Sequence, residues 1–201
     1  MTQCMLFDPA EIAGAAKKQN AVAVNVKNKK GRYLLGKRLD RCRQVIGSVS
    51  MGDSIHYASM GEWSLHDIIV HMLEQTGPAD VDICTWSVSE DAVRVMLANI
   101  ESGLITGLRM LLDWRVRVRR PEVMQLLSSQ LRRADIRLTN AHAKVATIIN
   151  DDWSIAIVGS ANLTNNHRIE VGVVCCSEQA ADFHRGWMSE ELLGATPFEE
   201  G

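Results

Sequence analysis

Four polar residues between positions 141 and 174 are of types that can act on a phosphate: His142, Lys144, Asn162 and Glu170. An imidazole is a nucleophile near neutral pH, and a carboxylate can orient it by accepting a hydrogen bond from its other ring nitrogen. An ammonium group and an amide can neutralise the non-bridging oxygens of a phosphate. Together these residue types indicate phosphoryl transfer.

Three strands are expected to bring these side chains to one edge of a sheet. The strand candidates are residues 142–149, 154–159 and 169–176. His142 and Lys144 stand two positions apart on the first candidate, so their side chains are expected to share one face. The second candidate ends in Gly159-Ser160-Ala161-Asn162, where glycine permits a tight exit and polar side chains gather. Glu170 stands at the start of the third.

The rest of the chain alternates helices and strands. Ser64 and Asp67 form a capping-box start for a helix that runs through Leu73 and stops at Gly77-Pro78. The other expected helices are residues 89–103, 121–132 and 177–193, and the other expected strands are residues 81–88, 104–119 and 136–138. This order, strand-dense toward the C-terminus, predicts an α/β fold with a mixed β-sheet flanked by helices on both faces.

A length of 201 residues suits one domain, or one domain with an extension. Residues 1–50 are interpreted as a basic N-terminal extension, helical or partly disordered, with helical character at residues 10–16 and again after Gly31. No run of about 18 apolar residues occurs, and the first ten residues lack the pattern of a secretory signal. Five cysteines without a C-x-x-C pair indicate reduced thiols and no cysteine zinc site. We therefore expect a cytoplasmic protein with no membrane span.

The formal net charge of −2 conceals two basic clusters. Residues 17–43 carry ten Lys or Arg against one acid, and residues 109–137 carry eight arginines against three acids. Such clusters favour a polyanionic partner, although a solvated surface or a flexible arm has the same composition. The candidate nucleic-acid contacts are the basic residues of the first cluster: Lys17, Lys18, Lys27, Lys29, Lys30, Arg32, Lys37, Arg38, Arg41 and Arg43.

The segments AHAK, VGSANLT and RIEVGVV resemble the H-x-K … G-S-x-N signature of the phospholipase D superfamily and the glutamate that follows it there. The resemblance implies a phospholipase D-like αβα sandwich, with residues 51–201 as the catalytic domain after the extension of residues 1–50. One position departs from the pattern, because Ile149 stands where the family usually has an aspartate. Asp151 and Asp152 follow it, and either one of them replaces that aspartate or, as we favour, they form a hairpin turn with Asn150.

The resemblance also implies a role for each residue of the motif. His142 would attack the phosphorus of a phosphodiester and form a phosphohistidine. Lys144 and Asn162 would hold the phosphate oxygens, with Ser160 assisting, and Glu170 would fix the tautomer and orientation of His142. The other five histidines do not stand in an H-x-K sequence. The second histidine that the reaction needs, as general acid and then base, is therefore expected from the partner in a two-fold homodimer, and no metal or cofactor is required.

The sequence leaves three functions open. A metal-independent nuclease agrees best with the motif and the basic clusters, and DNA is favoured over RNA as its partner. A catalytically silent nucleic-acid-binding protein of the same fold would account for Ile149. A lipid phosphodiesterase would lay the basic N-terminal segment on anionic lipid. Four tryptophans could stack on bases, with packing as the default alternative: Trp63, Trp86, Trp114 and Trp153.

Overall fold

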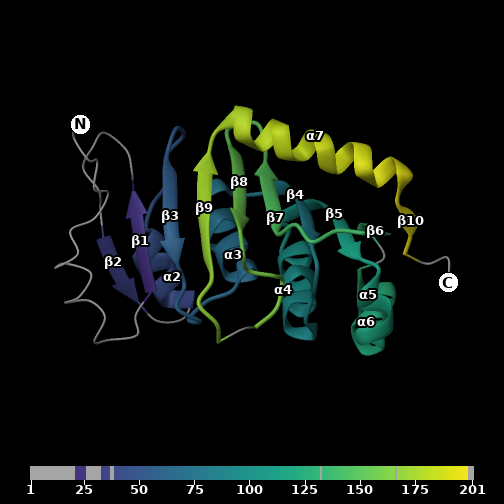
Figure 1. Ribbon diagram of the computed structural model, residues 1–201. Coiled ribbons are helices and arrows are strands. Elements are labelled where there is room, and N and C mark those ends of the chain that lie inside the picture. The colour runs from purple at the N-terminus through teal and green to yellow at the C-terminus, as the bar shows by residue number, and fades with distance from the viewer. Residues whose placement is uncertain (1–20, 26–32, 37–38, 132, 166, 199–201) are drawn as a thin grey trace, which may run out of the picture.

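One mixed β-sheet runs through the residues that the computed structural model describes, which are 21–25, 33–36, 39–131, 133–165 and 167–198 (Figure 1). Its strand order is β10-β6-β5-β4-β7-β8-β9-β3-β1-β2. β5 pairs in parallel with β4 and with β6, and the other neighbours are antiparallel. The strands are β1 (Ala21–Asn25), β2 (Tyr33–Gly36), β3 (Ser54–Ala58), β4 (Ala79–Thr85), β5 (Ile105–Asp113), β6 (Asp135–Thr139), β7 (Val145–Ile149), β8 (Ser154–Gly159), β9 (Val171–Cys176) and β10 (Thr196–Pro197).

Helices cover both faces of this sheet. They are α2 (Leu39–Ile46), α3 (Leu65–Thr76), α4 (Glu90–Glu101), α5 (Arg115–Arg119), α6 (Pro121–Gln130) and α7 (Glu178–Gly194). α7 packs along β4, β7, β8 and β9 on one face, and α2, α3 and α4 lie on the other (Figure 1). This arrangement confirms the predicted α/β fold, a mixed sheet flanked by helices.

The side chains of β7 alternate between two hydrophobic cores, one on each face. Ala146 and Ile148 belong to the larger core, under α2, α3 and α4. Val145 belongs to a smaller core, where it meets Cys84 of β4 and Met188 of α7. Because successive side chains of a strand point to opposite faces, a strand that is buried on both faces, as β7 is, needs a cover on both sides.

α3 begins and ends where the sequence predicts. The backbone N–H of Ser64 donates to the carboxylate of Asp67 at 2.7 Å, within a capping box. Gly77 ends the helix with a φ of 73°, a conformation that glycine adopts without steric cost. α4 likewise starts after a capping residue, because the hydroxyl of Ser89 accepts a hydrogen bond from the N–H of Ala92.

The strand predicted over residues 104–119 is too long. The structure ends β5 at Asp113 and places residues 115–119 in α5. The carboxylate of Asp113 accepts a hydrogen bond from the N–H of Arg115 at 3.0 Å, which turns the chain out of the sheet. The Arg-Val alternation of this stretch imitates a strand, but in α5 Val116 is buried and Val118 is 71% exposed.

The described part of residues 1–50 lies against the sheet. β1 pairs with β3, and β2 pairs with β1. Cys42, Val45 and Ile46 of α2 are buried in the larger core. The helix expected after Gly31 therefore begins only at Leu39, and strand β2 precedes it. The helix expected at residues 10–16 lies outside the described residues, and the domain boundary at residue 50 stays a prediction.

Candidate active site

The residues of the motif meet at the edge of the sheet toward which β8 points in Figure 1. β7 and β9 run antiparallel to β8, so their first residues lie beside the last residues of β8. β4 and β5 also end at this edge, because β4 is antiparallel to β7 and parallel to β5. The topology thus brings Lys144, Ser160 and Glu170 close to the strand ends at Thr85 and Asp113.

His142 and Lys144 lie in the segment just before β7. The prediction that both stand on a strand is wrong, since β7 begins only at Val145. The carbonyl of Lys144 nevertheless accepts a hydrogen bond from the N–H of Gly159 at 3.2 Å, which ties this segment to the end of β8. The ammonium group of Lys144 donates to the carbonyl oxygen of His142 at 2.6 Å. The imidazole of His142 is exposed, as a nucleophile requires.

Ser160 and Glu170 are bonded to each other across the ends of β8 and β9. The hydroxyl of Ser160 donates to the carboxylate of Glu170 and accepts a hydrogen bond of 3.0 Å from the N–H of Val171. The backbone carbonyl of Glu170 accepts from the N–H of Ser59, after β3, at 2.7 Å. Glu170 is buried. A buried carboxylate fixed by its neighbours is suited to orient an imidazole.

Asn162 is held by a residue that the sequence analysis missed. The hydroxyl of Thr85, at the end of β4, reaches the carbonyl of Ser87 at 3.0 Å and the side-chain oxygen of Asn162 at 3.4 Å. The same hydroxyl accepts a hydrogen bond from the N–H of Leu163 at 3.2 Å. These contacts engage the oxygen of the Asn162 amide and leave its N–H donors to serve another acceptor, such as a phosphate oxygen.

The ring of Trp86 packs beside His142 and Lys144 of the motif. Its ring centroid lies 5.6 Å from that of His142, at an interplanar angle of 60°. The ammonium nitrogen of Lys144 lies 5.9 Å from the Trp86 centroid, and the guanidinium carbon of Arg119 lies 5.5 Å from it. The sequence analysis named Trp86 only as a possible stacking surface for bases. The strands predicted over residues 81–88 and 104–119 hid that Trp86 follows the end of β4 and that Arg119 ends α5. A search for aromatic and basic residues just after the expected ends of strands could have identified them.

Burial and neighbouring acidic groups have opposite effects on the pKa of Lys144. Burial holds the pKa of the Lys144 ammonium below its ordinary value. The thiol of Cys84 and the carboxylates of Glu170 and Asp113 act on that pKa in the opposite direction. The negative charges of Glu170 and Asp113 therefore favour the charged form of Lys144.

A shallow groove of about 500 Å³ adjoins Ser160, between β3, β8 and β9. Tyr57 lines it, and burial raises the pKa of the Tyr57 phenol. The ring fits because the facing residue is Gly172, where an added Cβ would lie 2.5 Å from the Tyr57 hydroxyl oxygen. Within the described residues that hydroxyl has no hydrogen-bond partner.

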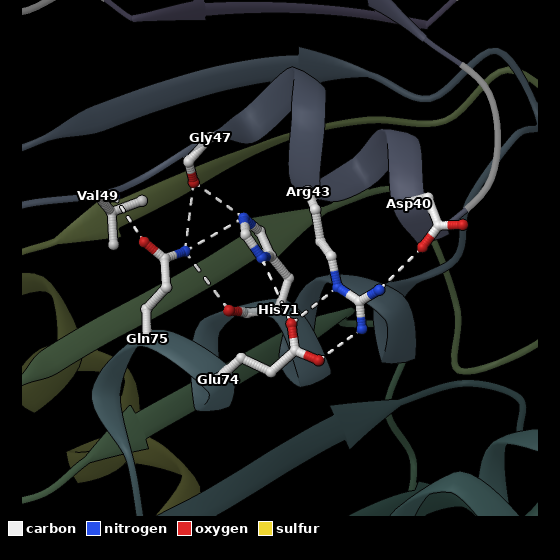
Figure 2. Close-up of polar contacts among 7 residues, drawn as sticks. All are labelled: Asp40, Arg43, Gly47, Val49, His71, Glu74 and Gln75. Atoms are coloured by element: carbon white, nitrogen blue, oxygen red, sulfur yellow. Dashed lines mark hydrogen bonds and ion pairs between the residues drawn. The ribbon is translucent and has the colours of Figure 1, made fainter.

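Most of the first basic cluster lies outside the described residues, and nothing is described of the Arg41 side chain. Arg43 is placed, on α2. Its guanidinium donates to the carboxylate of Glu74 at 2.8 and 2.5 Å and to that of Asp40 at 2.9 Å (Figure 2). Arg43 thus joins α2 to α3, and its role as a nucleic-acid contact stays a prediction.

Within the part of the chain that the structure describes, some arginines of the second basic cluster, residues 109–137, form ion pairs with carboxylates and others do not. Arg109 is bound to Asp82 beneath α7, Arg115 to Asp113 and Arg137 to Asp135. Among the described residues Arg119 has no acidic partner. It is the arginine of this cluster that lies against Trp86 beside the motif.

Ile149 and the two aspartates after it lie at the far end of β7 from His142. Asp151 and Asp152 are exposed in the turn between β7 and β8, and the side chain of Asn150 accepts hydrogen bonds from the N–H groups of Asp152 and Trp153. A strand of five residues spans roughly 17 Å. In this position the aspartates form a turn and are too distant to act on a phosphate at His142.

Similar solved structures share this architecture. A phosphatidylserine synthase from Haemophilus influenzae Rd KW20 has a TM-score of 0.52 at 13% sequence identity, and the match covers 82% of this chain and 42% of that one. A polyphosphate kinase from Porphyromonas gingivalis has a TM-score of 0.54 at 15% identity, covering 74% of this chain and 27% of that one. This chain therefore spans less than half the length of either protein. The likeness is one of fold, and the fold is phospholipase D-like.

The phospholipase D-like fold rests on structure alone, because no protein-family model matches the sequence and no curated protein matches it. Across the described part of the chain, no helix is long and apolar enough to cross a membrane. The same part of the chain contains no group of three or more His, Cys, Asp or Glu side chains arranged to hold a metal ion.

Proposed function

We propose that the protein is a metal-independent phosphodiesterase that hydrolyses nucleic acid, with DNA favoured over RNA. The observation that carries the proposal is the convergence of the motif at one sheet edge. Lys144 is tied by its carbonyl to Gly159, and Ser160, the next residue, is bonded to Glu170. Nothing in the packing of a sheet requires a lysine, a serine, an amide and a buried carboxylate to gather beside an exposed histidine.

The proposed reaction has two steps. In the first, a ring nitrogen of His142 bonds to phosphorus while the bond from phosphorus to the leaving oxygen breaks, and a second imidazole protonates that oxygen. In the second, the second imidazole takes a proton from water, the water oxygen bonds to phosphorus, and the bond to His142 breaks. Lys144 and the amide N–H groups of Asn162 neutralise the non-bridging oxygens in both steps.

The second imidazole comes from a second copy of the chain. The sequence contains one H-x-K, so one subunit supplies one such histidine. A two-fold axis passing near His142 places two copies of the ring on either side of one phosphate, which is the self-complementary geometry of a symmetric dimer. The exposure of His142 is consistent with this arrangement.

Charge favours nucleic acid as the substrate. The first basic cluster is suited to phosphate oxygens. From the second cluster Arg119, which has no acidic partner among the described residues, lies at the edge of the sheet where the motif lies. The missing family aspartate does not argue for a silent protein, because Ile149 pairs with Asp80 and Ser154 far from His142.

The test is cleavage of supercoiled plasmid and of a single-stranded oligonucleotide in excess EDTA. The wild type is expected to cleave, and His142→Ala to lose at least about 10³-fold in rate. His184→Ala, on α7, is the matched control and should retain activity. If the wild type and His142→Ala cleave equally, the nuclease proposal fails. Salt-dependent binding without cleavage would identify a silent binding protein, and choline release from vesicles a lipid enzyme.

A further inference from the structure

Two tryptophans leave adjacent parallel strands at the edge that carries the motif. Trp86 follows the last residue of β4 and Trp114 the last residue of β5, and the register pairs Thr85 with Leu112. The N–H of Trp114 donates to the carbonyl of Thr139 at 3.0 Å, which fixes its backbone to the end of β6. Trp114 is 51% exposed, which is unusual for a residue with so large an apolar ring.

Arginines accompany both rings. The guanidinium carbon of Arg115 lies 5.8 Å from the ring centroid of Trp114 and that of Arg119 lies 5.5 Å from the centroid of Trp86. Arg115 is neutralised by Asp113. Arg119 is exposed and, in the described part of the chain, faces no carboxylate, so its charge is available to an anion. Lys144 contacts the same ring as Arg119, so this charge lies beside the phosphate-binding residues.

An exposed indole and an unneutralised guanidinium at the sheet edge that carries the candidate phosphate site match one chemistry closely. Single-stranded nucleic acids offer unpaired base faces that stack on aromatic side chains, together with a regularly charged backbone. In a duplex those base faces are already stacked on one another, and an indole at a strand end cannot reach them.

Resting on the proposed function, we infer that Trp114 and Arg119 form a binding surface for single-stranded nucleic acid on one side of the scissile phosphate. Trp114 stacks on a base, and Arg119 holds a backbone phosphate next to the one at His142. Trp86 positions Arg119 and Lys144 by contact with both. The protein therefore prefers single strands to duplexes, and the preference resides in this surface.

The experiment measures binding of fluorescein-labelled DNA by the His142→Ala protein, which cannot turn it over. Three ligands of equal length are compared at one salt concentration: a single strand, its duplex, and a single strand of abasic sites that keeps the phosphates without the bases. The single strand is expected to bind at least tenfold more tightly than the other two. In this background Trp114→Ala should lose about 5- to 100-fold for the single strand only, and Trp114→Phe should retain most of the affinity.

Arg119→Ala is expected to weaken all three ligands and to reduce the slope of log affinity against log salt by about one. Arg133→Ala is the matched control, because Arg133 is also exposed but precedes β6 at the opposite edge of the sheet. Circular dichroism and thermal unfolding confirm that each variant is folded.

Equal affinity for single strand and duplex, or equal effects of Trp114→Ala on the single strand and the abasic strand, would overturn the inference. In either case, EDTA-resistant cleavage that requires His142 would leave the proposed function standing. If the protein bound none of the three ligands and did not cleave DNA, both would fail.

Discussion

The hydroxyl of Ser160 donates a hydrogen bond to the carboxylate of Glu170, and this bond joins the end of β8 to the start of β9 at the centre of the candidate site. The same oxygen accepts from the N–H of Val171. Ser160 therefore acts as a bridge that fixes the buried carboxylate, and through the carboxylate the orientation proposed for His142.

Replacing Ser160 by alanine should lower both stability and activity. The buried Glu170 carboxylate loses a donor, which costs about 1–3 kcal/mol of the free energy of unfolding. Cleavage should fall by about 10–100-fold, the usual effect of removing a group that orients another. Urea unfolding and EDTA-resistant cleavage measure the two effects. Ser160→Thr, which keeps the hydroxyl, should recover part of both, and an alanine variant with wild-type activity would contradict the bridging role.

Trp86 should affect turnover more than substrate affinity. Its ring contacts His142, Lys144 and Arg119, so its loss releases three groups at once. Trp86→Ala is expected to lower kcat about 10–100-fold, because small displacements of reacting groups are costly. Trp86→Phe keeps an aromatic face and should lose less. Steady-state kinetics on a single-stranded oligonucleotide separate kcat from KM, and a change in KM alone would show that the ring binds substrate without positioning the motif.

Asp82 should be a strong determinant of stability although it is remote from the chemistry. It is 3% exposed. Its carboxylate oxygens accept hydrogen bonds from the Arg109 guanidinium at 2.6 and 2.7 Å, and one of them lies 3.4 Å from Nε of Arg185 on α7. Asp82→Ala leaves these guanidinium groups without their carboxylate under α7 and should cost about 3–5 kcal/mol in urea unfolding. Asp80→Ala is the control, since the half-exposed Asp80–Arg185 pair is worth about 0–1 kcal/mol. Equal losses in the two variants would refute the buried network.

Stability should decline on mild acidification because of His71. Burial lowers the pKa of His71 below its ordinary 6.5, although the Gly47 carbonyl, 2.9 Å from Nε2, and Glu74 oppose the shift (Figure 2). Below about pH 6.5 the unfolded chain binds a proton that the folded chain does not, so the free energy of unfolding falls as the pH drops.

Urea unfolding between pH 7.5 and 5.5 measures this decline, and His71→Gln should make it shallower. His66 and His184, whose pKa values burial also lowers, account for part of the remaining slope. An unchanged slope in His71→Gln would show that His71 is not one of the groups responsible.

The sequence predicted the fold class because the local signals agree with the tertiary structure. The Ser64–Asp67 capping box and the glycine after α3 lie where the pattern places them. β1 was not predicted, because the lysines on both sides of residues 21–25 dominate the composition of that region. The order of the sheet was also out of reach, since the pairing of β3 with β9 joins residues more than a hundred positions apart.

The candidate site was predicted in its motif and missed in its surroundings. His142, Lys144 and Glu170 are recognisable by type and spacing, and the topology brings them to one edge. The places of Trp86 and Arg119 beside the motif were missed because both residues lie in segments predicted as strands, and the Arg-Val alternation of Arg115–Arg119 imitates a strand. The contacts of the Trp86 ring with His142, Lys144 and Arg119 show that these residues lie beside the motif.

The most direct test of the composite site is the arrangement of two His142 side chains around one phosphate. A crystal structure of the protein with inorganic phosphate bound would measure it. We predict a two-fold dimer in which a ring nitrogen from each His142 lies about 3–3.5 Å from the phosphate, on opposite sides. A monomer, or a dimer whose two His142 rings face separate sites, would contradict the account.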